Sequence, residues 1–196
     1  MERFFSSHLI LEAGCDEAGR GPLAGPVLAA AVILPPDFVL PGLNDSKVLN
    51  EGIRLSLESE IKYQAVSWAV AQSSPEEIDR FNILNASIMA MHRALDQLTP
   101  KPDLILVDGN RFKNYPFIPH QCMIKGDARF ASIAAASILA KNERDRIMKQ
   151  LAAEYPGYGW ERNMAYPTRE HRKALIDLGP TPYHRRSFVV KESKGQ

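Results

Sequence analysis

Residues 9–34, LILEAGCDEAGRGPLAGPVLAAAVIL, place two apolar stretches on either side of a glycine-rich connection. The first stretch, residues 9–15, predicts a strand that runs into Asp16 and Glu17. The second, residues 26–34, predicts another strand because it is rich in Val, Ile and Ala. Successive side chains on a regular strand point to opposite faces, so Asp16 and Glu17 can serve one site only where the strand is distorted. We therefore expect the strand to break at this dipeptide.

Further strand and helix patterns follow this opening. Their order predicts an α/β fold with a mixed central sheet flanked by helices. We expect a main domain over residues 1–150 and a small, basic, helical C-terminal extension over residues 151–196. The expected elements are a strand over 65–72, a helix from Pro75 to about Leu98, a buried strand over 103–109, a strand over 121–125, a helix over 130–151 and a short helix over 168–178.

The composition is that of an ordinary soluble globular protein, with 45% hydrophobic and 24% charged residues in a chain of 196. The first residues lack the pattern of a secretory signal, and no apolar run has the length of a membrane span. We therefore expect a cytoplasmic protein without a membrane partner, and a monomer. Cys15 and Cys122 could pair, but free thiols are the expectation for that compartment.

The charge is divided unevenly along the chain. Residues 1–140 hold 12 Lys+Arg and 16 Asp+Glu, a net charge of −4, whereas residues 141–196 hold 12 and 7, a net charge of +5. This division is typical of a protein that holds a cationic metal in one region and grips phosphates with another. A solvated basic surface would give the same numbers, so charge alone leaves both interpretations open.

Four carboxylates fall where predicted elements begin or end. Asp16 and Glu17 follow the first strand, Asp108 ends the apolar run, and Asp127 precedes the alanine-rich helix. Carboxylates gathered in a folded cleft repel one another unless a cation compensates them, which favours a metal site. Asp127 could instead be a helix N-cap, and Asp108 could begin an Asp-Gly turn.

The metal expected there is a hard cation. No His or Cys lies near the four carboxylates in ligand spacing, so the site would offer oxygen ligands only. Oxygen ligands suit Mg²⁺ or Mn²⁺ rather than zinc. Two such ions bridged by a carboxylate would give the two-metal arrangement used for in-line phosphoryl chemistry.

The glycine-rich connection is not a dinucleotide fingerprint. Gly19, Gly21 and Gly25 give the spacing G-x-G-x-x-x-G, and a strand follows where the fingerprint requires a helix. The loop can instead let backbone amides approach a ligand closely, with Arg20 available for a phosphate. Main-chain contact with a 2′-hydroxyl is one way in which proteins distinguish RNA from DNA.

The C-terminal part mixes aromatic and cationic residues in the manner of a nucleic-acid surface. Aromatic residues at this density also pack small subdomains, so both interpretations stay open. His171 and His184 are expected to be structural or to contact phosphate rather than to act as general bases. The residues concerned are Tyr155, Tyr158, Trp160, Arg162, Tyr166, Arg169, His171, Arg172, Lys173, Tyr183, His184, Arg185 and Arg186.

Together these motifs resemble those of the ribonuclease HII family, over about residues 9–188. The most specific is Asp16-Glu17-Ala18-Gly19-Arg20-Gly21 followed by Gly25-Pro26. The resemblance continues through residues 44–47 (NDSK), 82–84 (NIL), 107–109 (VDG), 125–127 (KGD), 132–141 (SIAAASILAK), 144–145 (RD) and 184–188 (HRRSF).

The resemblance implies a ribonuclease H-like catalytic domain and an endonuclease. Its substrates would be RNA/DNA hybrids and duplex DNA containing single ribonucleotides, cut to leave 3′-hydroxyl and 5′-phosphate ends. It implies that Asp16, Glu17, Asp108 and Asp127 are the catalytic, metal-binding carboxylates. The substrate contacts implied are Gly19, Arg20 and Gly21 at the 2′-hydroxyl and flanking phosphate, Tyr166 at the neighbouring sugar, and Lys47, His184 and Arg185 at the backbone.

The sequence departs from the family pattern at Ala165, where a glycine usually precedes the tyrosine. If that position needs a positive φ, Ala165 strains the turn that places Tyr166. Two other functions also remain as hypotheses. One is a DNA-structure-specific nuclease of the same fold, and the other is a non-catalytic nucleic-acid-binding module.

Overall fold

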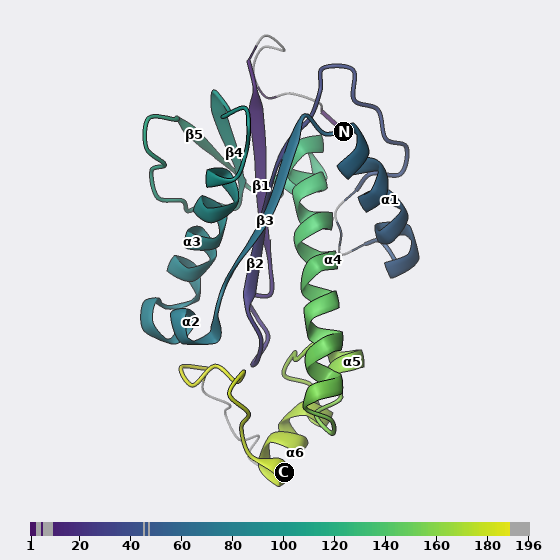
Figure 1. The fold of residues 1–196 in the computed structure, drawn as a ribbon, viewed down its shortest axis with the longest axis vertical. Helices are drawn as coiled ribbons and strands as arrows, with labels where there is room; N and C mark the ends of the chain where they lie inside the picture. The colour runs from purple at the N-terminus through teal and green to yellow at the C-terminus, as the bar shows by residue number, and fades with distance from the viewer. Residues whose placement is uncertain (3–4, 6–9, 45, 47, 189–196) are drawn as a thin grey trace.

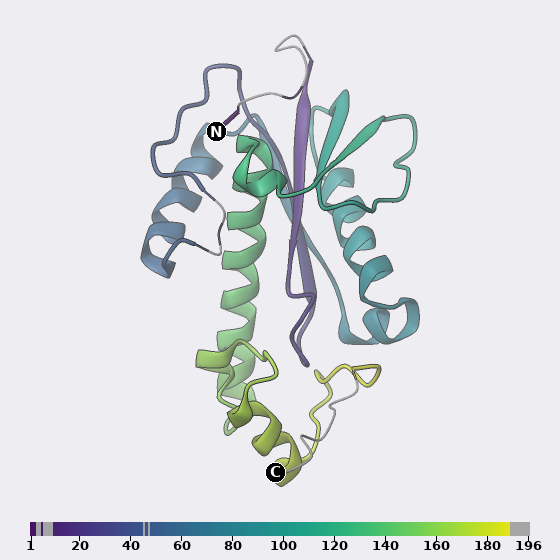
Figure 2. The same cartoon turned by 180° about the vertical axis from the view of Figure 1, so that it is seen from behind.

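The computed structural model describes residues 1–2, 5, 10–44, 46 and 48–188. Five strands form one mixed sheet in the order β3-β2-β1-β4-β5, which confirms the predicted α/β architecture. The first three strands pair as an antiparallel meander, and the last two run parallel to β1 (Figures 1 and 2). The strands are β1 (Glu12–Ala18), β2 (Val27–Ile33), β3 (Ser67–Ser73), β4 (Leu104–Asp108) and β5 (His120–Met123).

Helices cover both faces of this sheet, as Figure 1 shows. Helix α3 packs on one face and the long helix α4 on the other, with α1 against the outside of α4. Both inner faces are apolar, so burial of the sheet drives this three-layer arrangement. The helices are α1 (Glu51–Gln64), α2 (Pro75–Phe81), α3 (Ile83–Asp96), α4 (Ala131–Glu154), α5 (Trp160–Asn163) and α6 (Arg169–Leu178), with a short 3₁₀ helix, η1 (Gly126–Ala128).

Glycine at position 14 sets how closely α4 lies on the sheet. A Cβ atom there would stand 2.2 Å from the carbonyl carbon of Ser132 and 2.3 Å from the amide nitrogen of Ile133. Both are backbone atoms of the first turn of α4, which have no free rotamer with which to move away. The missing side chain of Gly14 therefore brings the start of α4 against β1, just before the acidic dipeptide.

The expected break at the acidic dipeptide is wrong. Strand β1 keeps its pairing with β2 through Asp16, Glu17 and Ala18. Because β1 lies at the centre of the sheet, hydrogen bonds to β2 hold these residues extended although β4 has already ended. The two carboxylates consequently point to opposite faces, as strand geometry requires.

One helical prediction is wrong, and helix α1 was not predicted. The helix expected from Pro75 to Leu98 is divided at Asn82, which has φ 65° and caps α3 by accepting a hydrogen bond from the amide of Asn85. This positive φ lies outside the α-helical region, so one helix ends at Asn82 and the next one starts there. Helix α1 was missed, although Asn50 at its N-cap accepts from the amide of Ile53. The other expected strands and helices are confirmed within a few residues.

The C-terminal part packs below the sheet, at the end where β1 finishes and β2 begins (Figures 1 and 2). A separate apolar cluster joins Met148 and Leu151 of α4 to Trp160 and Ala174. Helix α4 runs through the expected boundary at residue 150, and the division into two domains stays a prediction. None of the helices in the described part of the chain combines the length and the apolar composition that a membrane span requires.

Candidate active site

Three aspartates meet at the end of the parallel strands. Asp16 lies on β1, Asp108 is the last residue of β4, and Asp127 lies in η1. One carboxylate oxygen from each is within 4.8 Å of the others. The register explains the first pair, since β1 and β4 are aligned up to Cys15 and Val107, one residue before Asp16 and Asp108.

Local hydrogen bonds orient these carboxylates. The amide of Glu17 donates to Asp16 Oδ1 over 2.7 Å, and the amide of Gly126 donates to Asp108 Oδ1 over 2.8 Å. The turn packs closely at Gly126, where a Cβ atom would lie 2.6 Å from Ile133 Cδ1 and 3.0 Å from Met123 Cβ. The 3₁₀ turn therefore comes close enough to β4 to bring Asp127 beside Asp108.

The purely structural alternatives for Asp127 and Asp108, a helix N-cap and an Asp-Gly turn, do not explain where these side chains lie. The N-cap of α4 is Phe130, which makes no side-chain cap bond, so Asp127 does not cap that helix. Gly109 does adopt φ 99°, as an Asp-Gly turn requires, but the Asp108 side chain accepts from Gly126 across the loop. Both side chains face their neighbouring acids instead of serving only local backbone turns.

The electrostatics of the group favour a bound cation. Burial raises the pKa of Asp16 well above its usual range, and the charges of Glu17 and Asp108 raise it further. Asp16 and Asp127 are buried. Bringing these negative charges together is unfavourable unless a cation compensates them. Three oxygen donors at this spacing fit a hard divalent cation such as Mg²⁺ or Mn²⁺.

Glu17 approaches the site from the other face of the sheet. Asp108 and Glu17 line a cavity against α3 together with Leu84 and Met91, whereas Asp16 faces Ser137 of α4. Within the described residues, the close group consists of the three aspartates without Glu17. Glu17 accepts a hydrogen bond from Arg20 over 3.2 Å. The four predicted carboxylates thus surround the open end of β4 from both faces.

A cavity of about 230 Å³ connects the carboxylates to the glycine-rich loop. Tyr166 closes one side of it, and a Cβ atom on Gly21 would lie 3.5 Å from that ring. The structure therefore brings the loop, Tyr166 and the acids together. The lining residues are Asp16, Glu17, Ala18, Gly19, Arg20, Gly21, Ser46, Asp108, Ser137, Lys141, Arg144 and Tyr166.

Two cationic side chains that line this cavity were not predicted as site residues from the sequence. Lys141 and Arg144 follow Ser137 at helical spacing on α4, so all three face the cavity. Lys141 also pairs with Asp145, while Arg144 donates to the carbonyl of Met164 over 3.1 Å. The i, i+4, i+7 spacing from Ser137 was the signal that could have identified them.

The turn before Tyr166 has the strained backbone expected from the sequence. Ala165 adopts φ 63° and its neighbour Met164 adopts φ 48°. The amide of Leu23 donates to the Ala165 carbonyl over 2.8 Å, and the Asn163 side chain accepts from the Ala165 amide. Contacts with the glycine-rich loop thus hold Ala165 in a conformation that costs about 1 kcal/mol.

His184 and Arg185 do not face the cavity. His184 is buried against Tyr158, Trp160 and His171, and its Nε2 lies 3.1 Å from His171 Nε2. Arg185 is also buried, beneath the glycine-rich loop. The interpretation of His184 as a structural residue fits this position. Lys47 lies outside the described residues.

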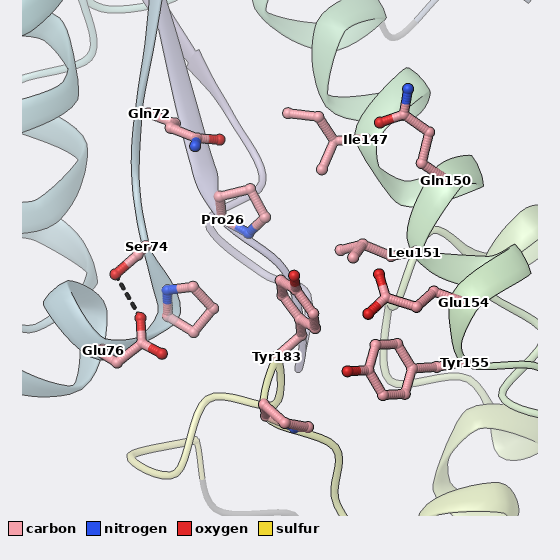
Figure 3. A pocket seen from close by; sticks show the side chains of 12 residues that line it. Pro26, Gln72, Ser74, Glu76, Ile147, Gln150, Leu151, Glu154, Tyr155 and Tyr183 are labelled. Atoms are coloured by element: carbon pink, nitrogen blue, oxygen red, sulfur yellow. Dashed lines mark hydrogen bonds between the residues drawn. The ribbon is translucent and has the colours of Figure 1, made fainter.

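A cavity of about 620 Å³ lies elsewhere, and among the described residues its lining shares no member with that of the carboxylate site. In Figure 3, Glu76 and Glu154 line it from opposite sides, with Pro26 and Tyr183 between them. The lining that the structure describes includes these two acids and neither lysine nor arginine, which disfavours a phosphate ligand there. The acidic lining distinguishes this cavity from the one beside the carboxylates, which also contains Arg20, Lys141 and Arg144.

Comparisons with known proteins agree with this geometry. The family model for ribonuclease HII matches residues 13–191. The chain is 60% identical to ribonuclease HII of Bacteroides fragilis over 91% of its own length and 89% of that protein, and 55% identical to that of Porphyromonas gingivalis over 90% and 88%. Ribonuclease H2 from Pyrococcus horikoshii superposes with a TM-score of 0.75 at 28% identity, covering 91% of this chain and 94% of that one. The chain therefore belongs to the ribonuclease HII family of ribonuclease H enzymes.

Proposed function

We propose that this enzyme hydrolyses the phosphodiester at ribonucleotides in RNA/DNA hybrids and at single ribonucleotides embedded in duplex DNA. Asp16, Glu17, Asp108 and Asp127 would hold a pair of divalent cations, Mg²⁺ or Mn²⁺. Cleavage would leave 3′-hydroxyl and 5′-phosphate ends.

One observation carries the proposal: Asp16 and Asp108 of the aspartate group, together with Glu17, line the same cavity as the Gly19–Gly21 loop and Tyr166. A nuclease needs oxygen ligands for cations, and a ribonucleotide-directed one also needs backbone close to a sugar. Divalent cations, when bound, supply activation of water and stabilisation of the leaving oxygen. The cavity of about 230 Å³ that Asp16, Asp108 and the loop line together supports both roles.

The protein groups divide the work of binding and orientation. The three aspartates would supply the negative charge that retains the cations, and Glu17 would supply a fourth carboxylate from the opposite face. Arg20 is about half exposed, and Lys141 also lines the cavity, so both can contact phosphates. The Tyr166 ring, which is 44% exposed beside Gly21, would pack on the neighbouring sugar.

The proposal extends to the setting of the enzyme. We infer a cytoplasmic monomer whose partners are nucleic acids rather than membranes. The basic residues of the C-terminal extension, residues 151–196, would hold the duplex backbone while the domain over residues 1–150 carries the chemistry. The net charge of +5 over residues 141–196 supports this division of roles.

The test is incision of a labelled duplex that contains one ribonucleotide, with and without Mg²⁺. We expect metal-dependent cutting next to that residue and 3′-hydroxyl and 5′-phosphate ends. An all-deoxy duplex of the same sequence is the control. Equal cutting of both duplexes would support a DNA-structure-specific nuclease instead, and binding without cutting would support a non-catalytic module.

A further inference from the structure

The side chain of Arg185 is committed entirely to the glycine-rich loop. It is only 2% exposed, and each of its five N–H groups has a backbone carbonyl as acceptor. No donor is left for a substrate phosphate. Its Nε donates to Gly25 over 3.0 Å, Nη1 to Arg20 over 3.1 Å and Pro22 over 2.8 Å, and Nη2 to Gly19 over 2.7 Å and Pro26 over 3.2 Å.

These bonds fix the direction of two peptide groups. In a trans peptide the C=O and N–H point in opposite directions, and the peptides at residues 19–21 are trans. The carbonyls of Gly19 and Arg20 point at the buried guanidinium, so the amides of Arg20 and Gly21 point away from it. Both residues line the cavity beside the carboxylates. Within the described part of the chain, neither amide donates to a protein acceptor.

A lysine could not make the same arrangement. The planar guanidinium reaches five acceptors in a fixed fork, whereas an ammonium group offers three donors from one point. Burial and the nearby cation of Arg144 lower the pKa of Arg185 to about 9, so the group stays charged at neutral pH. The dipoles of the five converging carbonyl groups stabilise the guanidinium charge in place of a carboxylate partner. The charge of Arg185 therefore attracts the loop carbonyls and holds the loop against the guanidinium.

The backbone around Arg185 is anchored on both sides. Its amide donates to the carbonyl of Leu23, and the amide of Gly25 donates to the carbonyl of Tyr183, each over 2.9 Å. Asp79 of α2 accepts from the amides of Arg186 and Ser187 and from the Ser187 hydroxyl. Helix α2 thus fixes the segment that carries the guanidinium.

We propose that Arg185 is a positioning residue for ribonucleotide discrimination: it orients the Gly19-Arg20 and Arg20-Gly21 peptides so that their N–H groups are presented to an oxygen of the ribonucleotide. This role rests on the proposed function. It assigns Arg185 an action through the loop instead of contact with the nucleic-acid backbone.

The test compares binding of two duplexes that differ by one 2′-hydroxyl. Arg185→Lys is placed in an Asp108→Asn background to suppress cutting, and affinities for the single-ribonucleotide and all-deoxy duplexes are measured. We expect the ribonucleotide preference to fall about tenfold, the effect of losing one or two oriented hydrogen bonds, with all-deoxy affinity nearly unchanged. An unchanged preference would overturn the proposal.

Hydrogen exchange provides a readout that needs no substrate. The Leu23 and Gly25 amides, which donate to Ala165 and Tyr183, should exchange faster in Arg185→Lys and to a smaller extent in Asp79→Asn. The control is Arg54→Lys, because Arg54 is another buried arginine but donates to Leu49, Asn142 and Asp145. It should destabilise the protein without selectively exposing the loop.

The two failures are distinguishable. If the protein with native Arg185 shows no ribonucleotide preference, the proposed function fails. The hydrogen-exchange result still tests whether Arg185 holds the glycine-rich loop. If that preference is present and Arg185→Lys keeps both the preference and the slow exchange of Leu23 and Gly25, only the positioning role is wrong.

Discussion

Three of the acids, Asp16, Glu17 and Asp108, line one cavity with the glycine-rich loop, but the acids and the loop are held by different kinds of structure. Regular secondary structure positions the acids. Asp16 and Asp108 each follow the last aligned pair of the parallel strands β1 and β4, Cys15 and Val107. The loop and Tyr166 are irregular backbone, held by the buried side chains of Arg144 and Arg185. The first region depends on sheet geometry, whereas the second depends on contacts made by residues far away in the sequence.

The largest effect should come from the acids. Asp108→Asn keeps an oxygen that can accept from Gly126 but removes a charge from the aspartate group. Turnover on the single-ribonucleotide duplex should fall roughly a thousandfold, equivalent to losing about 4 kcal/mol of transition-state stabilisation. Without metal the variant should unfold at a higher temperature, because Asp16 has lost a repulsive neighbour. Lower stability with full turnover would contradict the metal site.

The stability of the loop region should instead depend on pH, because the segments next to the loop contain the buried pair His171 and His184. The Trp160 indole donates to His171 Nε2, and the Thr181 amide donates to His184 Nδ1, so both acceptor nitrogens are unprotonated. Burial, and then the neighbouring His171, lower the pKa of His184 to about 4. The unfolded chain takes up this proton near pH 6.5.

Stability from His184 is therefore fully present above pH 6.5 and is lost as pH falls toward 4, by about 3 kcal/mol. Urea unfolding at pH 7.5 and 4.5 measures the loss. His184→Phe, which keeps a ring but takes up no proton, should lose less over the same interval. Equal losses in both proteins would exclude His184 as the source.

The same contrast explains what the sequence could and could not predict. The apolar runs ending at Asp16 and Asp108 predicted strands, and parallel strand ends meet at one edge, so the grouping of the acids could be predicted from the sequence. The path of β1 past the end of β4 could not be predicted, because it depends on which neighbouring strand continues to pair with β1. Glu17 consequently lies on the face opposite Asp16.

The side-chain contacts that hold the glycine-rich loop were the hardest part to predict from the sequence. Nothing local in His184-Arg185-Arg186 indicates that the middle arginine is buried under residues 19–26, more than 150 positions earlier. An arginine with five carbonyl acceptors has the same sequence signature as one that binds phosphate. Side-chain to backbone bonds across such separations follow from the completed fold and not from periodicity.

Two glycines in the loop offer a finer test of the contrast. Gly19 has φ 97°, and a Cβ atom there would lie 2.2 Å from Arg144 Nε, whereas on Gly21 the nearest atom is the Tyr166 ring at 3.5 Å. Gly19→Ala should lower the free energy of unfolding by about 2 kcal/mol. Gly21→Ala should leave it within about 0.5 kcal/mol but reduce incision about tenfold, since the methyl occupies space beside Tyr166.

Thermal unfolding and initial incision rates of the two variants, measured side by side, distinguish the roles. If Gly21→Ala cuts as fast as the unmodified enzyme, close approach at Gly21 does not contribute to recognition. If Gly19→Ala is as stable as the unmodified enzyme, the loop and Arg144 are less tightly packed than their distances indicate.

The smallest effect is expected at Ala165, where the sequence departs from the usual glycine. Replacement by glycine removes a left-handed strain of about 1 kcal/mol. It also removes a buried methyl worth about 0.8 kcal/mol and increases the entropy of the unfolded chain by about 0.5 kcal/mol. These terms nearly cancel, so Ala165→Gly should change the free energy of unfolding by less than about 1 kcal/mol and incision by less than twofold. A large gain in incision would mean that the alanine displaces Tyr166, and that the contacts from Leu23 and Arg144 only partly correct the strained turn.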